Sequence, residues 1–270
     1  FIVSTSLFGA MILLTYKVFV INLARSPQRL TAISTQLAQL GIPFERIEGV
    51  DGGLLSADDI EAVSPKELAE KSYHRALGKG EIGCSLSHKR AWQKIMDDDL
   101  DFAFVLEDDI GLEDNFADVV NLMANLPHAN WDFIKLYPLR RGGGSNIRDS
   151  FDYQGHQFVS YHKFPISAVA QVVSKQGARS LLKHMPYILE PVDGHIKSWW
   201  SLGIYPFGLM PYCVSVDLDG LSDINPHGGL EKMKQRKLTK LRLNWTRAFK
   251  RMLATPSLDK HFNQFKNSLK

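Results

Sequence analysis

Three consecutive acidic residues, Glu107, Asp108 and Asp109, directly follow an apolar run in the segment FAFVLEDDI, residues 102–110. The apolar run predicts a buried strand, and the carboxyl end of such a strand is where open α/β sheets bind ligands. Adjacent carboxylates repel one another unless water or a cation compensates their charge. Oxygen ligands of this kind suit Mg²⁺ or Mn²⁺. The alternative is a solvated acidic turn before a helix.

Side chains alternate along an extended segment, so Glu107 and Asp109 are expected on one side and Asp108 on the other. We therefore assign Glu107 and Asp109 to a metal ion and give Asp108 a hydrogen-bonding role. This division depends on the strand continuing through the triplet, and a turn that begins one residue early would undo it.

A second segment, GEIGCSLSH, gathers small and polar residues just before a helical pattern. It contains Gly80, Gly83, Ser85, Ser87 and His88. Backbone N–H groups at the start of a helix attract phosphate, which makes this segment a second candidate for ligand binding. The alternative is structural, because glycines before a helix are common and a nearby histidine more often has a packing role.

The elements that must position these residues alternate between strand and helix. Residues 17–23 are typical of a buried strand, residues 28–41 repeat leucine and isoleucine at helical spacing, and residues 43–52 return as a strand. A later helix is expected to turn Leu86, Trp92, Ile95 and Met96 toward the sheet. This β–α–β order predicts the α/β class, with a mostly parallel central sheet flanked by helices.

The chain has 270 residues, a net charge of +3 and two cysteines, Cys84 and Cys213. Two cysteines in a chain of this length make no disulfide framework, so reduced thiols in a cytosolic protein are expected. The apolar stretch at the N-terminus is interrupted by polar residues and no basic region precedes it. Neither a membrane span nor a secretory signal is therefore predicted there.

Charge is divided unevenly along the chain. Residues 231–270 hold twelve Lys and Arg against two acidic residues, while the preceding 230 residues hold 20 basic and 27 acidic ones. Leucines and aromatic residues are spaced among the basic residues as in an amphipathic helix. The predicted organisation is one domain over residues 17–230 and a basic helical tail over residues 231–270. The tail is expected to lie on an anionic membrane; a solvated or oligomer-packing helix is the alternative.

Six segments occur in the order and approximate spacing of a known family: VFVINLARSPQRL, GKGEIGCSLSH, FVLEDDI, WDFIKLY, SKQGARSLL and PVDGHIKSWW. On these motifs the chain resembles glycosyltransferase family 25, the bacterial lipooligosaccharide galactosyltransferases and their collagen-modifying relatives. The resemblance covers about residues 17–225. It implies a GT-A type α/β domain, a nucleotide-sugar donor, a divalent metal and inversion at the transferred sugar.

The resemblance also assigns roles to residues. The first strand-to-helix turn would bind the uridine edge of the donor through Asn22, Leu23, Arg25 and Arg29. The acidic triplet matches the metal motif of the family, which gives Mn²⁺ or Mg²⁺ as cofactor with Glu107 and Asp109 as ligands. The residues Ser85, Ser87 and His88 would face the donor or the acceptor, and Asp108 the sugar or ribose.

The catalytic base would come from the segment PVDGH, where Asp193 matches a Pro-x-Asp element of the family. A carboxylate suits the deprotonation of an acceptor hydroxyl, and His195 is the second choice. The alternative for Asp193 is an Asx-type turn with Gly194. A third metal ligand would come from a late loop, where His227 is the candidate and an exposed loop residue the alternative. Gln171 stands where the family has an aromatic residue, which leaves the acceptor preference open.

The predicted function is a metal-dependent inverting glycosyltransferase. It would move a hexose, with galactose from UDP-galactose as the first choice, onto a lipooligosaccharide or lipopolysaccharide acceptor on a lipid carrier. The expected location is the cytoplasm, peripheral on the inner face of the bacterial inner membrane. No nucleic-acid partner is expected, because no binding motif accompanies the basic tail. The alternatives are a nucleotidyltransferase and a catalytically silent membrane-associated scaffold.

Overall fold

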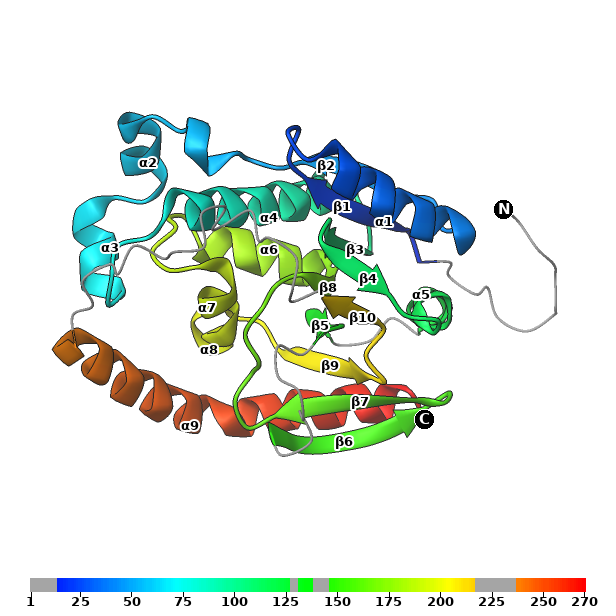
Figure 1. Ribbon diagram of the computed structural model, residues 1–270. Helices are drawn as coiled ribbons and strands as arrows, with labels where there is room; N and C mark the ends of the chain where they lie inside the picture. Colours follow the sequence, from blue (N-terminus) through cyan, green and yellow to red (C-terminus); the bar gives the residue numbers. More distant parts are fainter. Residues whose placement is uncertain (1–13, 127–130, 138–145, 217–236) are drawn as a thin grey trace.

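The computed structural model describes residues 14–126, 131–137, 146–216 and 237–270 (Figure 1). An eight-stranded sheet has the order β2-β1-β3-β8-β5-β9-β7-β6, and β4 and β10 form a separate two-stranded sheet. The strands are β1 (Tyr16–Asn22), β2 (Glu45–Glu48), β3 (Phe102–Glu107), β4 (Ile110–Leu112), β5 (Phe133–Lys135), β6 (Ile147–Tyr153), β7 (His156–Tyr161), β8 (Ala170–Ser174), β9 (Pro206–Met210) and β10 (Val214–Val216).

Six of the eight strands in the large sheet run in the same direction. β1 is parallel to β2 and β3, and β5 is parallel to β9. The two reversed strands are β8, which is antiparallel to both β3 and β5, and β7, which is antiparallel to both β9 and β6. The predicted α/β class with a mostly parallel central sheet flanked by helices is thus confirmed, and β8 brings a reversed strand into its centre.

Helices cover the sheet and lead into it (Figure 1). They are α1 (Pro27–Gln39), α2 (Ala57–Val63), α3 (Lys66–Ser72), α4 (Lys79–Asp97), α5 (Phe116–Ala124), α6 (Lys175–His184), α7 (Val192–Lys197), α8 (Trp199–Leu202) and α9 (Lys237–Ser268), with a 3₁₀ turn at Gly52–Leu54. The predicted strand–helix–strand unit is present as β1, α1 and β2. Of the four residues of α4 expected to face the sheet, Trp92 and Ile95 are fully buried, while Leu86 and Met96 are only partly buried.

The C-terminal half of α9 belongs to the hydrophobic core. Leu258, Phe262 and Phe265 are buried, and the ring of Phe265 lies 4.9 Å from that of Phe158 in β7. The ring of Phe262 lies 5.0 Å from that of Phe207 in β9. The last turns of the predicted tail therefore pack on the sheet, while the boundary predicted at residue 230 lies outside the described residues. Within the described chain, no helix is both long and apolar enough to cross a bilayer.

Replacing Phe265 with alanine is expected to lower the free energy of unfolding by about 3–5 kcal/mol, because a fully buried ring leaves a cavity. The matched control is Phe249→Ala on the same helix, whose side chain is 58% exposed and should change stability by no more than about 0.5 kcal/mol. Urea denaturation of both variants measures the difference. Equal effects would contradict the division of α9 into a core half and an exposed half.

Candidate active site at the end of β3

The acidic triplet lies where β3 ends. Glu107 is the last residue of the strand, and Asp108 and Asp109 form a bend before β4. Strand alternation therefore stops at Glu107 and does not determine where the other two side chains point. Their surroundings have to be taken from the contacts that each carboxylate makes.

Asp108 is held by the end of β1 and the start of α1. The side-chain amide of Asn22 donates to Asp108 Oδ2 at 2.5 Å, and Nη1 of Arg29 lies 3.7 Å from Asp108 Oδ1. The same guanidinium nitrogen lies 3.8 Å from Asp109 Oδ2. Asn22 is buried and also accepts from Nε of Arg46 at 3.0 Å. The structure thus brings two residues of the predicted donor-binding turn, Asn22 and Arg29, to the acids.

Asp109 is the least compensated of the three carboxylates. Its Oδ1 is buried and has no hydrogen-bond partner among the described residues. Burial, followed by the negative charge of Glu107, raises the pKa of Asp109 to about 6. A buried, unsatisfied carboxylate oxygen beside a second carboxylate fits a hard divalent cation. The residues present therefore suit Mg²⁺ or Mn²⁺ held by Glu107 and Asp109.

Glu107 is held by a buried histidine. Nε2 of His88 lies 2.9 Å from Glu107 Oε1, and Nδ1 of His88 lies 2.9 Å from Nε2 of Gln171. The same Gln171 nitrogen lies 3.2 Å from the carbonyl oxygen of Ala168. Only an N–H group can face that carbonyl, so the Gln171 amide donates to Nδ1 and the ring proton is on Nε2. His88 therefore donates a hydrogen bond to Glu107, and Gln171 fixes this tautomer.

A different metal site is conceivable at the same place, because one ligand atom each of Cys84, His88 and Glu107 lies within 4.8 Å of the others. A thiolate and an imidazole would suit zinc. The histidine nitrogen that faces this group carries a proton, however, and burial together with the charge of Glu107 raises the pKa of the Cys84 thiol. Metal binding there would have to displace a proton from both groups, so the hydrogen-bond pattern favours the pair Glu107 and Asp109.

The predicted hydroxyls of α4 are satisfied inside the protein. Ser87 Oγ accepts from the backbone N–H of Val50 at 2.8 Å, and Ser85 Oγ donates to the carbonyl of Glu81 at 2.8 Å. A Cβ atom on Gly83 would lie 2.5 Å from the carbonyl oxygen of Val50, so this glycine permits close packing of the segment after β2. These contacts describe a packing role, and contact of Ser85 or Ser87 with a donor or acceptor stays a prediction.

The remaining residues of the first turn face the segment after β2. Arg25 forms an ion pair with Asp51, and this hydrogen bond lowers the pKa of the Asp51 carboxyl. Leu23 is partly buried, and a Cβ atom on Gly49 would lie 3.1 Å from its side chain. Asp51 was not among the predicted site residues, since nothing in its local pattern distinguishes it from a turn residue. The uridine-binding role of Leu23 and Arg25 stays a prediction.

Asp193, the predicted base, is the second residue of the short helix α7. Its Oδ1 accepts from the N–H of Gly194 at 2.8 Å and its Oδ2 from the N–H of Ser167 at 3.2 Å. The bond to Gly194 joins adjacent residues and is not the Asx turn, which would bond two residues on. The second bond comes from a distant segment. The charges of Glu107, Asp193, Asp109 and Glu81 all raise the pKa of the Cys84 thiol, after burial, so Asp193 lies within electrostatic range of the same thiol as the acids that follow β3.

His195 has a different environment. Its Nε2 lies 3.8 Å from Glu190 Oε1, and its buried Nδ1 has no partner in the part of the chain that the structure describes. Burial, and then the positive charge of Arg247, lowers the pKa of His195 to about 4. The imidazole is thus neutral near pH 7 and lies beside Glu190 and α9. His227 lies outside the described residues.

Two functional candidates were missed or undervalued at the sequence level. Gln171 was noted only as a departure, and its role follows from a contact 83 residues away along the chain. Lys135, in the segment WDFIKLY, is not among the predicted site residues. A lysine inside the apolar run WDFIKLY was the available signal, because a buried strand rarely accepts a charge without a partner.

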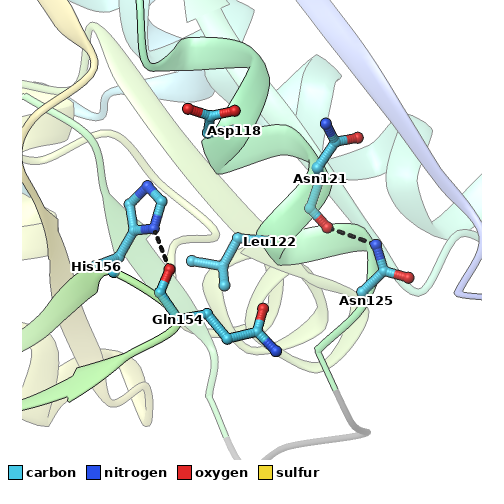
Figure 2. Close-up of a pocket in the computed structure, with 7 residues that line it drawn as sticks. Asp118, Asn121, Leu122, Asn125, Gln154 and His156 are labelled. Carbon is cyan, nitrogen blue, oxygen red and sulfur yellow. Dashed lines mark hydrogen bonds between the residues drawn. The ribbon is translucent and has the colours of Figure 1, made fainter.

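A separate pocket of about 460 Å³ lies between α5 and the β6–β7 turn (Figure 2). It contains none of the predicted site residues. Its lining consists of Asp118, Asn121, Leu122, Asn125, Gln154, Gly155 and His156. The Asn125 amide donates to the Asn121 carbonyl at 2.8 Å, and Nδ1 of His156 lies 3.2 Å from the Gln154 carbonyl oxygen. Figure 2 marks both contacts with dashed lines.

Comparison with known proteins identifies the family. The profile described as Glycosyltransferase family 25 (LPS biosynthesis protein) matches residues 15–196. The chain belongs to glycosyltransferase family 25. This match includes β1, α4, the acidic triplet and Asp193, so it covers the whole candidate site except His227.

Several curated members of glycosyltransferase family 25 are similar to the chain. Procollagen galactosyltransferase 1 of Danio rerio is 33% identical over 182 residues, which cover 66% of this chain and 30% of that protein. A family 25 member of Aedes aegypti is 30% identical over 189 residues, with 66% and 30% covered. A probable inactive family 25 member 3 of Rattus norvegicus is 31% identical over 184 residues, with 66% and 32% covered.

The chain thus spans about a third of the length of these curated relatives. A solved glycosyltransferase involved in the glycosylation of the major capsid of PBCV-1 shows a TM-score of 0.31 and 11% identity, covering 61% of this chain and 62% of that one. At this TM-score the likeness decides nothing about activity.

The buried charge of Asp109 predicts a pH-dependent stability. Its folded pKa, about 6, lies above its ordinary value of 3.8, so the ionised group destabilises the metal-free fold above pH 6 and has no effect below about pH 4. Asp109→Asn should therefore raise the free energy of unfolding at pH 7.5 by about 1–2 kcal/mol, allowing for partial exposure.

Denaturation of the metal-free protein in chelator at pH 4, 6 and 7.5 measures this difference, which should shrink toward zero at pH 4. The control is Asp118→Asn on α5, outside the acidic triplet. A stability difference that stays constant with pH would contradict the assignment of Asp109 as a buried, uncompensated carboxylate.

Proposed function

We propose that the chain is a metal-dependent inverting glycosyltransferase that moves a hexose from a nucleotide diphosphate donor to an acceptor hydroxyl. The observation that carries this proposal is the geometry at the end of β3. Glu107 is held by His88, while Asp109 keeps a buried oxygen without a partner in the described structure. Membership of glycosyltransferase family 25 supports the same reaction class.

Different residues of the chain have different roles in the proposed reaction. Bound Mg²⁺ or Mn²⁺ would act as a Lewis acid for the departing diphosphate. Arg29 supplies a fixed positive charge beside Asp108 and Asp109, where the charge of the leaving group grows. Asp193 would take the proton of the acceptor hydroxyl as that oxygen attacks the anomeric carbon from the face opposite the diphosphate. His195 is the weaker choice for this base, because burial lowers its pKa to about 4.

We also propose a specific sugar donor and a specific class of acceptor. UDP-galactose is the proposed donor, supported by the similarity to a protein named procollagen galactosyltransferase 1. A lipooligosaccharide or lipopolysaccharide oligosaccharide on a lipid carrier is the proposed acceptor, supported by the family description, which names LPS biosynthesis. A catalytically silent member remains the competing proposal, because a relative with 31% identity is described as probably inactive.

The purified full chain, supplied with Mn²⁺ and a panel of UDP-sugars, is expected to release UDP in the presence of oligosaccharide acceptors. Asp109→Ala should lower the metal-dependent rate at least a hundredfold, on the order expected when a transition-state charge loses its counter-ion. Cys84→Ala is the matched control and should retain activity, since its thiol is not a proposed ligand. Release of pyrophosphate would indicate a nucleotidyltransferase, and no binding of UDP with Mn²⁺ in calorimetry would indicate a silent scaffold.

We also propose that α9 docks on an anionic membrane. Its first half carries an apolar stripe at intervals of three or four residues, with side chains 56–85% exposed: Leu238, Leu241, Trp245, Phe249 and Met252. Arg247, on the opposite face of the helix, bonds to Glu190 of the body. The stripe therefore points away from the protein, with Lys237 and Arg242 beside it. Such a surface suits an anionic bilayer, which supports a peripheral location at the cytoplasmic face of the inner membrane.

The full chain is expected to co-sediment with vesicles of phosphatidylglycerol and phosphatidylcholine but not with phosphatidylcholine alone. The double variant Trp245→Ser and Phe249→Ser should bind at least about tenfold more weakly, because each ring contributes about 1.5–3 kcal/mol on burial. Leu54→Ser, at a site 85% exposed elsewhere, is the control and should bind normally. Equal binding of both variants would contradict the proposal, as would vesicle binding that does not weaken when salt is added.

A further inference from the structure

Lys135, at the end of β5, is a buried amine that the proposed reaction does not use. Its side chain is only 2% exposed, and its Nζ lies 5.3 Å from the centre of the Phe164 ring. Burial lowers its pKa to about 7, while the charges of Asp193 and Glu107 act in the opposite direction. Burying an amine is costly, and an apolar side chain of the same length would fill this space without that cost.

The Nζ of Lys135 donates a hydrogen bond to the carbonyl oxygen of Ser167. Ser167 is one of three described non-glycine residues with a positive φ, and its value is 89°. A serine in this region costs about 1–3 kcal/mol unless its surroundings enforce the conformation. The lysine amine is one of the groups that does so, because it fixes the direction of the Ser167 carbonyl.

The backbone N–H group of Ser167 contacts the candidate site. The backbone N–H of Ser167 donates to Oδ2 of Asp193 at 3.2 Å, while Oδ1 is held by the N–H of Gly194 at 2.8 Å. Among the described residues, each carboxylate oxygen thus has one protein donor, and each retains lone-pair capacity for a substrate hydroxyl. Rotation of the Ser167 peptide groups would remove one of these two donors and release the orientation of the carboxylate.

We propose that Lys135 is a positioning residue that holds the candidate base Asp193 through the left-handed backbone of Ser167. The role rests on the proposed function, because Asp193 has a reaction to serve only if the chain transfers a sugar. Lys135 itself touches neither the acceptor nor the donor in this role. Its contribution is to keep the peptide of Ser167 in the conformation that presents an N–H group to the carboxylate.

The activity test is a double-mutant cycle on the full chain with Mn²⁺, UDP-galactose and acceptor. Lys135→Met should lower kcat about ten- to a hundredfold with little change in KM for the donor, since a small misplacement of a catalytic group has effects of this size. Ser167→Gly keeps the N–H that Asp193 accepts and adopts a positive φ without strain, so in its background Lys135→Met should lower kcat by less. The double variant should then recover most of the kcat lost in Lys135→Met.

A second measurement does not depend on activity. Hydrogen–deuterium exchange of the peptide covering residues 165–169 should be faster in Lys135→Met than in wild type, while exchange in the core strand β3 stays unchanged. Exchange in Asp193→Ala should also rise in this peptide, because the acceptor of the Ser167 N–H is lost. If Lys135→Met does not fold, Lys135→Gln keeps a shorter donor and is used in both arms with the same expected direction.

Two results would overturn the proposal. One is unchanged exchange at residues 165–169 in the Lys135 variant. The other is a rise in KM for the donor that Ser167→Gly does not correct, which would mean that the lysine acts on the donor by charge. Failure of the proposed function is distinguishable, since a wild-type chain that transfers no sugar leaves the exchange measurement to decide the Lys135–Ser167–Asp193 arrangement.

Discussion

Repulsion between the like charges at the end of β3 is the constraint that the surrounding hydrogen bonds and positive charge offset. Asp108 is held by the amide of Asn22 and by Arg29, and Glu107 receives a hydrogen bond from His88. Asp109 keeps one buried oxygen unsatisfied within the described residues, and burial with the charge of Glu107 raises its pKa to about 6. Compensation is thus incomplete at one carboxylate, and a divalent cation between Glu107 and Asp109 would complete it.

The reversed strand β8 explains how backbone groups reach this place. Its first residue, Ala170, pairs with Leu106 near the carboxyl end of β3, and Gln171 pairs with the last residue of β5. A parallel strand in this position would begin at the amino-terminal end of β3, on the opposite side of the sheet from the candidate site. Because β8 is antiparallel, the connection that enters it passes the candidate site. Along residues 167–169 it offers an N–H to Asp193, a carbonyl to the Gln171 amide and a carbonyl to the N–H of Glu107 at 2.8 Å.

Local periodicity was enough to predict the parts of the fold that depend on nearby residues. It predicted β1, α1 and β2, the inward face of α4 with Trp92 and Ile95, and an acidic residue at the end of a buried strand. It could not predict pairings between residues far apart in the chain, such as the contact of Asn22 with Asp108 across 86 residues. The strand alternation behind the division of the acids also ended one residue too early, since the bend begins at Asp108. Such features depend on tertiary packing, which side-chain periodicity does not encode.

The second half of α9 buries its apolar residues in the core, whereas the first half exposes them. This difference bears on how the site would be oriented at a membrane. Phe262 and Phe265 anchor the end of the helix in the core, and Arg247 bonds to Glu190, three residues before Asp193. Both contacts join the helix that carries the exposed stripe, residues 238–252, to the body that carries the site. On a membrane, such a helix would fix the direction in which the acids and Asp193 face, in addition to raising the local concentration of enzyme. A flexible basic tail of the same composition would supply only the second effect.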